Sequence, residues 1–81
     1  MALFIGVHNM SGITDDIAQQ SWSAYKEACT RLGGNPKHTH YSLEKGKAFC
    51  LTEASSADIV QKGHDEANIP ISEIIEVKEL Q

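Results

Sequence analysis

The chain has 81 residues, and its seven Lys and Arg against eleven Asp and Glu give a formal net charge of −4 at pH 7. The basic residues are scattered, which argues against a nucleic-acid partner because phosphate backbones bind clustered basic faces. No apolar run approaches the ~20 residues of a bilayer-spanning helix, and the N-terminus lacks the pattern of a secretion signal. We therefore expect a single domain, residues 1–81, that binds neither nucleic acid nor membrane.

Residues 2–9, ALFIGVHN, predict a first β-strand, because they are apolar and partly β-branched and are followed by loop-forming residues. Side chains alternate across a strand, which gives one set of Leu3, Ile5 and Val7 and another of Phe4, Gly6 and His8. The first set is uniformly apolar. We therefore expect it to face the core, and His8 to point away from the core.

A first helix is predicted to begin after Thr14, whose hydroxyl can cap it, with two aspartates following at the positive end of the helix dipole. Apolar residues recur at steps of three and four up to Leu32, where a pair of glycines ends the pattern. Cys29 falls on the buried stripe as a small hydrophobe. Because Cys29 and Cys50 fall on different elements, we expect free thiols and a cytoplasmic location.

The stretch HTHYSLEKGKAFC predicts a β-hairpin, with strands over residues 37–43 and 47–53 around a turn that ends at Gly46. A glycine there suits the left-handed position that closes a three-residue loop. With that loop, His40 lies opposite Cys50 on the neighbouring strand. A loop of two or four residues would shift the pairing by one residue.

A second helix is predicted from Ser55, which has the spacing of a capping box with Asp58, to Asn68. Residues 72–78 predict a last strand. The order strand, helix, strand, strand, helix, strand predicts a ferredoxin-like α+β sandwich, with an antiparallel-type sheet and both helices on one face. Nothing in the chain covers the second face of that sheet.

The uncovered face is expected to carry most of the histidines. Alternation assigns to it Phe4, Gly6, His8, His38, His40, Ser42, Ala48, Cys50, Thr52, Ile74 and Glu76. A partly apolar sheet face requires a cover, and a second copy packed by two-fold symmetry is the simplest one. We therefore expect a homodimer in the form of an α+β barrel, whose enclosed space is lined by histidines.

These side chains suit a divalent metal ion, because borderline divalent ions prefer imidazole and thiolate ligands, although no dense motif such as CxxC or HExxH is present. The candidate ligands are the imidazoles of His8, His38 and His40, the thiolate of Cys50, and an oxygen of Glu76 or Glu53. His64 is a separate case, since its helix is expected to run away from the edge that carries His8. We interpret it as a helix-terminal histidine held by a hydrogen bond, with a ligand role as the alternative.

Two other functions stay open from the residues alone. Cys50 paired with His40 would be a candidate nucleophile, but no third orienting group or oxyanion loop can be identified. A dimeric α+β barrel enzyme could act on a small organic substrate enclosed between the two sheets. The remaining alternative is a structural module that binds no ligand.

The segment AFCLTEASSADIVQKGHDEANIPISEIIEV, residues 48–77, resembles a family of small bacterial proteins whose best-described type is a nickel-binding protein of actinobacteria. The resemblance covers nearly the whole chain. The matching residues are Cys50, Glu53, Ala54, His64 and the closing strand, together with His40 and His8. The resemblance implies a ferredoxin-like fold, a homodimer and a divalent metal, with nickel as the reference case.

Overall fold

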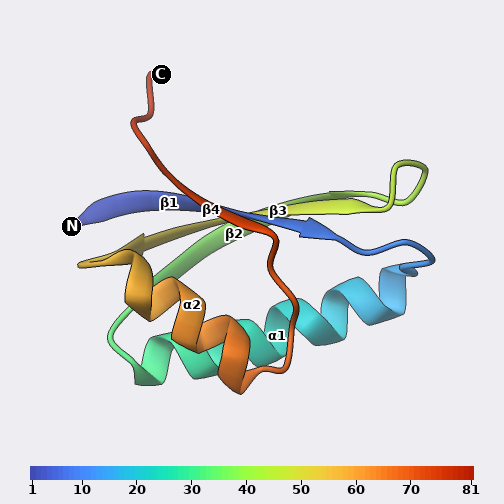
Figure 1. Cartoon of the computed structure of the whole chain (residues 1–81), viewed down its shortest axis with the longest axis horizontal. Helices are drawn as coiled ribbons and strands as arrows, with labels where there is room; N and C mark the ends of the chain where they lie inside the picture. Colours follow the sequence, from blue (N-terminus) through green and yellow to red (C-terminus); the bar gives the residue numbers. More distant parts are fainter.

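The computed structural model describes all 81 residues. Its elements, in chain order, are β1 (Ala2–Asn9), α1 (Asp15–Arg31), β2 (Asn35–Ser42), β3 (Lys47–Ala54), α2 (Ala57–Glu66) and β4 (Glu73–Val77). The strands form one sheet in the order β2-β3-β1-β4, and all neighbouring strands are antiparallel. Both helices lie on the same side of the sheet (Figure 1). The predicted ferredoxin-like α+β fold is confirmed.

The helix ends follow from local chemistry. The hydroxyl of Thr14 accepts a hydrogen bond from the Ile17 amide at 3.1 Å, as expected of a cap. After α1, Gly33 adopts a positive φ of 92°, which glycine tolerates without strain. The N-cap of α2 is Ser56, whose side chain makes no capping bond, so the capping box predicted at Ser55 does not form. Neither helix combines the length and apolar composition needed to cross a membrane.

The hairpin between β2 and β3 has a four-residue loop, one residue longer than the favoured prediction. Ser42 pairs with Lys47, and the Gly46 amide donates to the Ser42 carbonyl at 2.9 Å. Gly46 has the predicted left-handed conformation, with φ at 64°. The extra residue shifts the register by one, so His40 lies opposite Phe49 and Cys50 lies opposite Thr39.

The helices cover the face of the sheet that the sequence predicts to be uncovered. The side chains beneath the helices include Phe4, Gly6, His8, Ala48, Cys50, Thr52 and Ala54, which are buried. Ile74 packs against Phe4 in the same layer, and Glu76 pairs with Phe4 on the exposed edge strand. The sequence prediction is therefore wrong for the members of the outward set other than His38, His40 and Ser42, which do lie on the uncovered face. The residues wrongly placed are Phe4, Gly6, His8, Ala48, Cys50, Thr52, Ile74 and Glu76.

Close packing explains why this layer is built of small and polar residues. A Cβ atom on Gly6 would lie 2.9 Å from the Cys50 sulfur, and one on Gly63 would lie 3.0 Å from the ring of Tyr25. The first position lies between β1 and β3 and the second between α2 and α1, and neither leaves room for a larger side chain. Apolar character alone did not identify the covered face, because the chain's own helices cover the less apolar one.

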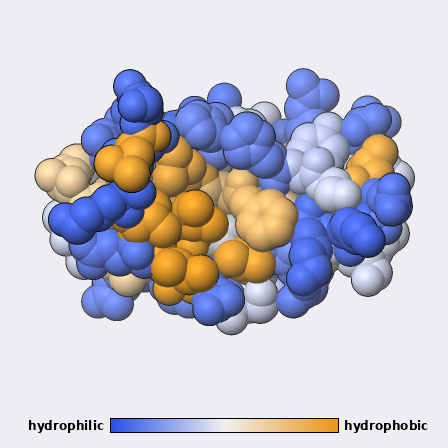
Figure 2. Space-filling model, turned by 90° about the horizontal axis from the view of Figure 1, so that it is seen from above, coloured by the Kyte–Doolittle hydropathy of each residue, from blue (hydrophilic) through white to orange (hydrophobic).

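The uncovered face is the more apolar side of the sheet. Strand pairing places on it Leu3, Ile5, Val7, Phe49, Leu51, Ile75 and Val77. We call this set the open-face patch. Phe49 and Ile75 are 39% and 41% exposed. Figure 2, which views this side of the molecule, shows a continuous hydrophobic area bordered by hydrophilic residues.

Candidate metal centre

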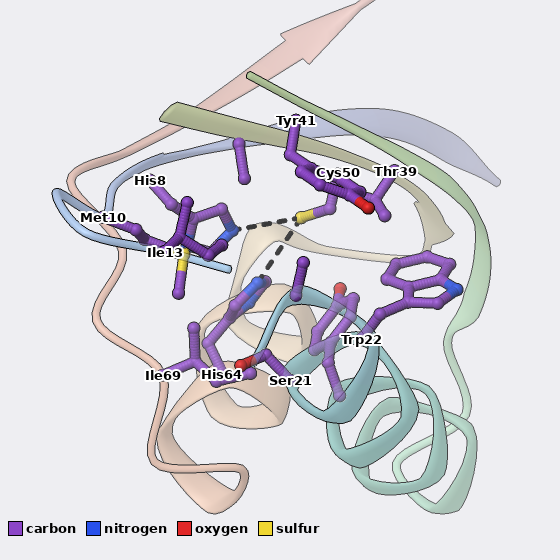
Figure 3. Close-up of a pocket in the computed structure, with 13 residues that line it drawn as sticks. His8, Met10, Ile13, Ser21, Trp22, Thr39, Tyr41, Cys50, His64 and Ile69 are labelled. Atoms are coloured by element: carbon purple, nitrogen blue, oxygen red, sulfur yellow. Dashed lines mark hydrogen bonds between the residues drawn. The ribbon is translucent and has the colours of Figure 1, made fainter. Parts of the chain in front are cut away.

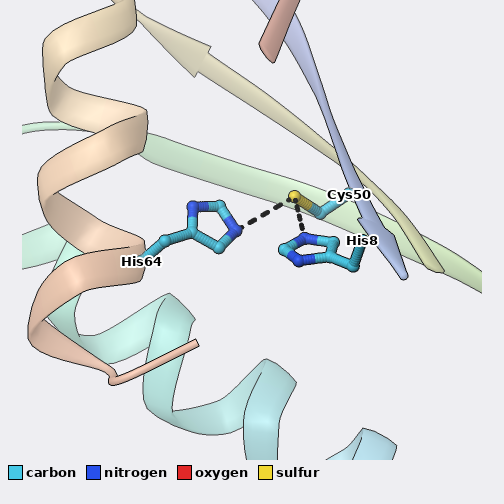
Figure 4. A group of neighbouring side chains, drawn as sticks. All are labelled: His8, Cys50 and His64. Carbon is cyan, nitrogen blue, oxygen red and sulfur yellow. Dashed lines mark hydrogen bonds between the residues drawn. The ribbon is translucent and has the colours of Figure 1, made fainter. Parts of the chain in front are cut away.

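Three buried side chains from three elements meet between the sheet and the helices. His8 ends β1, Cys50 lies in the middle of β3, and His64 lies in the last turn of α2. The Cys50 sulfur is 3.5 Å from Nε2 of His8 and 3.4 Å from Nε2 of His64. The three donor atoms lie within 4.8 Å of one another (Figure 4). We call these residues the His–Cys–His cluster.

The position of His64 corrects the sequence prediction, which placed it at the opposite end from His8. The ring centroids of His8 and His64 are 4.8 Å apart. The reason is strand direction: β3 is antiparallel to β1, and Ala2 pairs with Ala54. Because α2 follows Ala54, it starts beside the beginning of β1 and its last turn reaches the end of β1, where His8 lies.

The main chain determines which nitrogen of each ring carries the proton. Nδ1 of His8 is 2.8 Å from the carbonyl oxygen of Pro70, and Nδ1 of His64 is 2.7 Å from that of Val60. A carbonyl oxygen can only accept a hydrogen bond, so each Nδ1 must be the donor. In the neutral rings, both Nε2 atoms therefore carry a lone pair, and both lone pairs face the Cys50 sulfur. Second-sphere carbonyls orient metal-binding histidines in this way.

Burial keeps all three groups uncharged in the metal-free protein. Desolvation lowers the pKa of His8, against the opposing effect of its bond to Pro70, and lowers the pKa of His64 to about 4. Desolvation raises the pKa of the Cys50 thiol to about 11. The metal-free cluster at pH 7 is therefore one thiol with two neutral imidazoles, and not a thiolate–imidazolium pair.

The cluster is packed against α1 by aromatic stacking. The ring of Tyr25 stacks on His64 with centroids 3.9 Å apart, and its hydroxyl hydrogen-bonds the Thr52 hydroxyl at 2.6 Å. The contact between Tyr25 and His64 could not be predicted from the sequence, because the two residues lie on different helices. The sequence does not indicate the role of the Pro70 carbonyl either, because every residue type has a main-chain acceptor.

A small cavity of about 40 Å³ adjoins the cluster (Figure 3). Its volume is enough for one or a few water-sized molecules. The lining is largely apolar and contains no Asp, Glu, Lys or Arg side chain; it includes Met10, Ile13, Trp22 and Ile69 besides the cluster. Tyr41 lines the cavity but is 41% exposed, so it lies at the boundary with solvent. Its hydroxyl donates to Asp15 at 2.8 Å, which bridges β2 to the start of α1.

The other predicted ligands do not join the cluster. His38 and His40 form an edge-to-face pair on the open face, with ring centroids 5.2 Å apart. Glu53 also lies on that face, where it accepts from Asn35 at 3.1 Å and pairs with a lysine. Glu76 is exposed on the edge strand β4. The structure therefore unites His8, Cys50 and His64, and separates the other four from them.

The fold and the cluster define a class: a small ferredoxin-like α+β protein with a buried donor set of two imidazoles and one thiol. The chain belongs to the family described as "Nickel responsive protein SCO4226-like", which matches residues 4–77, so the predicted family resemblance is confirmed. The crystal structure of SCO4226 from Streptomyces coelicolor A3(2) is similar, with a TM-score of 0.91 and 31% identity over 99% of this chain and 100% of that chain. No curated protein sequence matches this chain.

Proposed function

We propose that this protein binds a divalent transition-metal ion at the His–Cys–His cluster, with nickel as the first candidate, and that it does so without catalysing a reaction. The observation that carries the proposal is a count of protons. Two Nε2 lone pairs face the Cys50 sulfur, and the thiol has a single proton to share between them. One lone pair therefore lacks a partner until a cation enters the cluster.

The distances also fit a metal ion. With bonds of about 2.3 Å to sulfur and about 2.1 Å to nitrogen, two ligands at a tetrahedral angle lie about 3.6 Å apart. The two sulfur–nitrogen separations are 3.5 and 3.4 Å. Loading would require little movement of the ligands, apart from a closer approach of the two Nε2 atoms. The ion would displace the thiol proton, since thiolate is the ligand form.

The family description supports nickel as the ion to test first, since it names a nickel-responsive protein. Imidazole and thiolate are both suitable ligands for nickel. His8, Cys50 and His64 would hold the ion. The cavity beside them leaves a further coordination position open to a water-sized ligand.

The proposal is tested by nickel titration of tag-free protein in a calorimeter. We expect one ion per chain and at least about a tenfold loss of affinity in Cys50→Ser. Cys29→Ser is the matched control, because Cys29 is an equally buried free thiol outside the cluster. A second control, His38→Ala with His40→Ala, removes the histidines of the open face. Loss of nickel binding in the double variant but not in Cys50→Ser would move the site to the open face and contradict the proposal.

We also propose that a second copy of the chain covers the open-face patch, giving a homodimer. Support comes from the extent of the patch, which includes seven apolar side chains from three strands, and from the small size of the domain. A two-fold axis through the patch would bury it against itself. The interface would be apolar rather than lined with histidines, because only His38 and His40 lie on this face.

A further inference from the structure

The cluster can supply only one negative charge to a bound ion. Of the eleven acidic side chains, ten are exposed, and the half-buried Glu53 lies on the other face of the sheet. No carboxylate lines the adjoining cavity. Asp65 is the one acid whose charge affects the pKa of His64. Its side chain is exposed and accepts a hydrogen bond from Gln61 at 2.9 Å. The Cys50 thiolate is therefore the only anion within the cluster.

This charge count discriminates between ions. A divalent ion bound by one thiolate and two neutral imidazoles leaves a net charge of +1 in a site where no ligand residue is more than 4% exposed. A monovalent ion with the same ligands gives a neutral complex. Because an uncompensated buried charge is costly, the cluster favours the monovalent ion.

The ligand types and their arrangement point to copper among monovalent ions. Soft sulfur ligands select Cu(I), and three-ligand sets of two histidines and one cysteine with a distant methionine are typical of copper. The thioether of Met10 lines the cavity beside the cluster (Figure 3). Its position is anchored by a 2.7 Å hydrogen bond from the Met10 amide to the Gly46 carbonyl.

We propose that the His–Cys–His cluster binds Cu(I) more tightly than nickel, with Met10 as a weak fourth ligand. The inference rests on the proposed function, since the same three side chains would hold either ion. Binding is an exchange without electron transfer: Cu⁺ replaces the proton of the Cys50 thiol, a Cu–S bond forms, and the proton passes to solvent.

The test is an anaerobic competition. Tag-free protein loaded with nickel is titrated with Cu(I) from a chromogenic Cu(I) chelator, and bound metals are measured after desalting. We expect one Cu(I) per chain, complete release of nickel, and an affinity for Cu(I) at least about tenfold higher than for nickel. Cys50→Ser should lose Cu(I) binding, and Cys29→Ser should keep it. X-ray absorption of the Cu(I)-loaded wild type should show a short Cu–S contact, whether or not Cys50→Ser folds.

Substitutions at the half-buried Met10 test the charge argument directly. Met10→Glu adds a second anion beside the cluster, so it should narrow the preference for Cu(I) over nickel by about tenfold or more. Met10→Leu, the matched neutral variant, should weaken Cu(I) by a few-fold and leave nickel unchanged.

The outcomes separate the two proposals. Nickel that binds through Cys50 but resists displacement by Cu(I) overturns the copper inference and leaves the proposed function standing. Cu(I) bound with only nitrogen neighbours also overturns it. If neither ion binds, or if both bind equally well to folded Cys50→Ser, the proposed function itself fails.

Discussion

Tyr25 stacks its ring on His64 while its hydroxyl reaches across to Thr52 on β3, so one side chain of α1 touches both a cluster histidine and the sheet. The hydrogen bond between the two hydroxyls is buried, and Thr52 is completely inaccessible to solvent. Removing the hydroxyl would leave the Thr52 side chain without a partner where water cannot replace it.

We therefore predict that Tyr25→Phe destabilises the protein by about 1–3 kcal/mol, the usual cost of a buried polar group left unpaired. The ring still stacks on His64, so nickel affinity should change by less than about threefold. Urea denaturation and calorimetry measure the two effects separately. An unchanged unfolding midpoint would show that the Tyr25–Thr52 bond contributes nothing to stability.

The buried neutral state of His64 predicts a pH dependence of stability in the metal-free protein. Its pKa is about 4 in the fold, against about 6.5 in an unfolded chain. As pH falls from 6.5 to 4, the unfolded chain takes up a proton that the folded chain excludes, so the free energy of unfolding decreases, by up to about 3 kcal/mol. Above pH 6.5 this contribution is constant.

Urea denaturation at several pH values should show that His64→Gln loses part of this dependence. His8 acts in the same direction, because its pKa is also lowered by burial, so a residual slope is expected. The exposed His40 provides the control His40→Gln, whose profile should follow the wild type. Parallel profiles for the wild type and His64→Gln would contradict the prediction.

Gly6 faces the Cys50 sulfur, and its missing side chain leaves room for the thiol. A Cβ atom there would lie 2.9 Å from that sulfur and 2.8 Å from Cδ1 of Ile71. We expect Gly6→Ala to displace the thiol and weaken nickel binding at least about tenfold. Gly34→Ala is the matched control, because it crowds the sulfur of Cys29 instead. Equal nickel affinities for the two variants, measured by calorimetry on folded protein, would count against the cluster as the site.

The bond between Tyr41 and Asp15 lies at the boundary between the cavity and solvent. Both side chains are exposed, so breaking the bond should have little effect on stability or on equilibrium affinity. We predict that Tyr41→Phe speeds both binding and release of nickel by similar factors, since it opens a route without changing a ligand. Stopped-flow mixing with a chelator measures release. A changed affinity with unchanged rates would be the contrary result.

The open-face patch provides a test of the proposed dimer. Phe49→Asp places a charge in the patch, and we expect it to convert a dimer to a monomer in light scattering coupled to size-exclusion chromatography. Leu43→Asp is the control, because Leu43 is 50% exposed but lies in the hairpin loop. A monomeric wild type, or dissociation by both variants, would argue against an interface at this patch.

Much of the fold could be predicted from the sequence. The cap at Thr14, the glycines after α1 and the left-handed Gly46 of the hairpin all act locally, and the structure agrees with each. Element order then restricted the topology, because right-handed connections leave few arrangements of four strands and two helices.

The candidate site was harder to predict, because it depends on which sheet face the helices cover. Alternation separated Leu3 from Phe4 correctly, but the choice of the covered face rested on apolar character, and that criterion failed. A second error came from loop length, since one extra residue moved His40 away from Cys50. His8 and Cys50 were correctly grouped together even so. Each lies on the less apolar side of its own strand, and the helices cover that side of both strands.

The two carbonyls that orient the cluster histidines belong to the main chain, and this affects how the protein can evolve. Every amino acid has a carbonyl, so exchanging the side chain at Val60 or Pro70 preserves the acceptor as long as the backbone path is kept. Pro70 is exposed, so substitutions there can accumulate without disturbing the donor atoms, whereas Val60 is fully buried and its side chain is restricted by core packing. An insertion or deletion between His64 and Pro70 would be far more damaging, because it would move the acceptor itself.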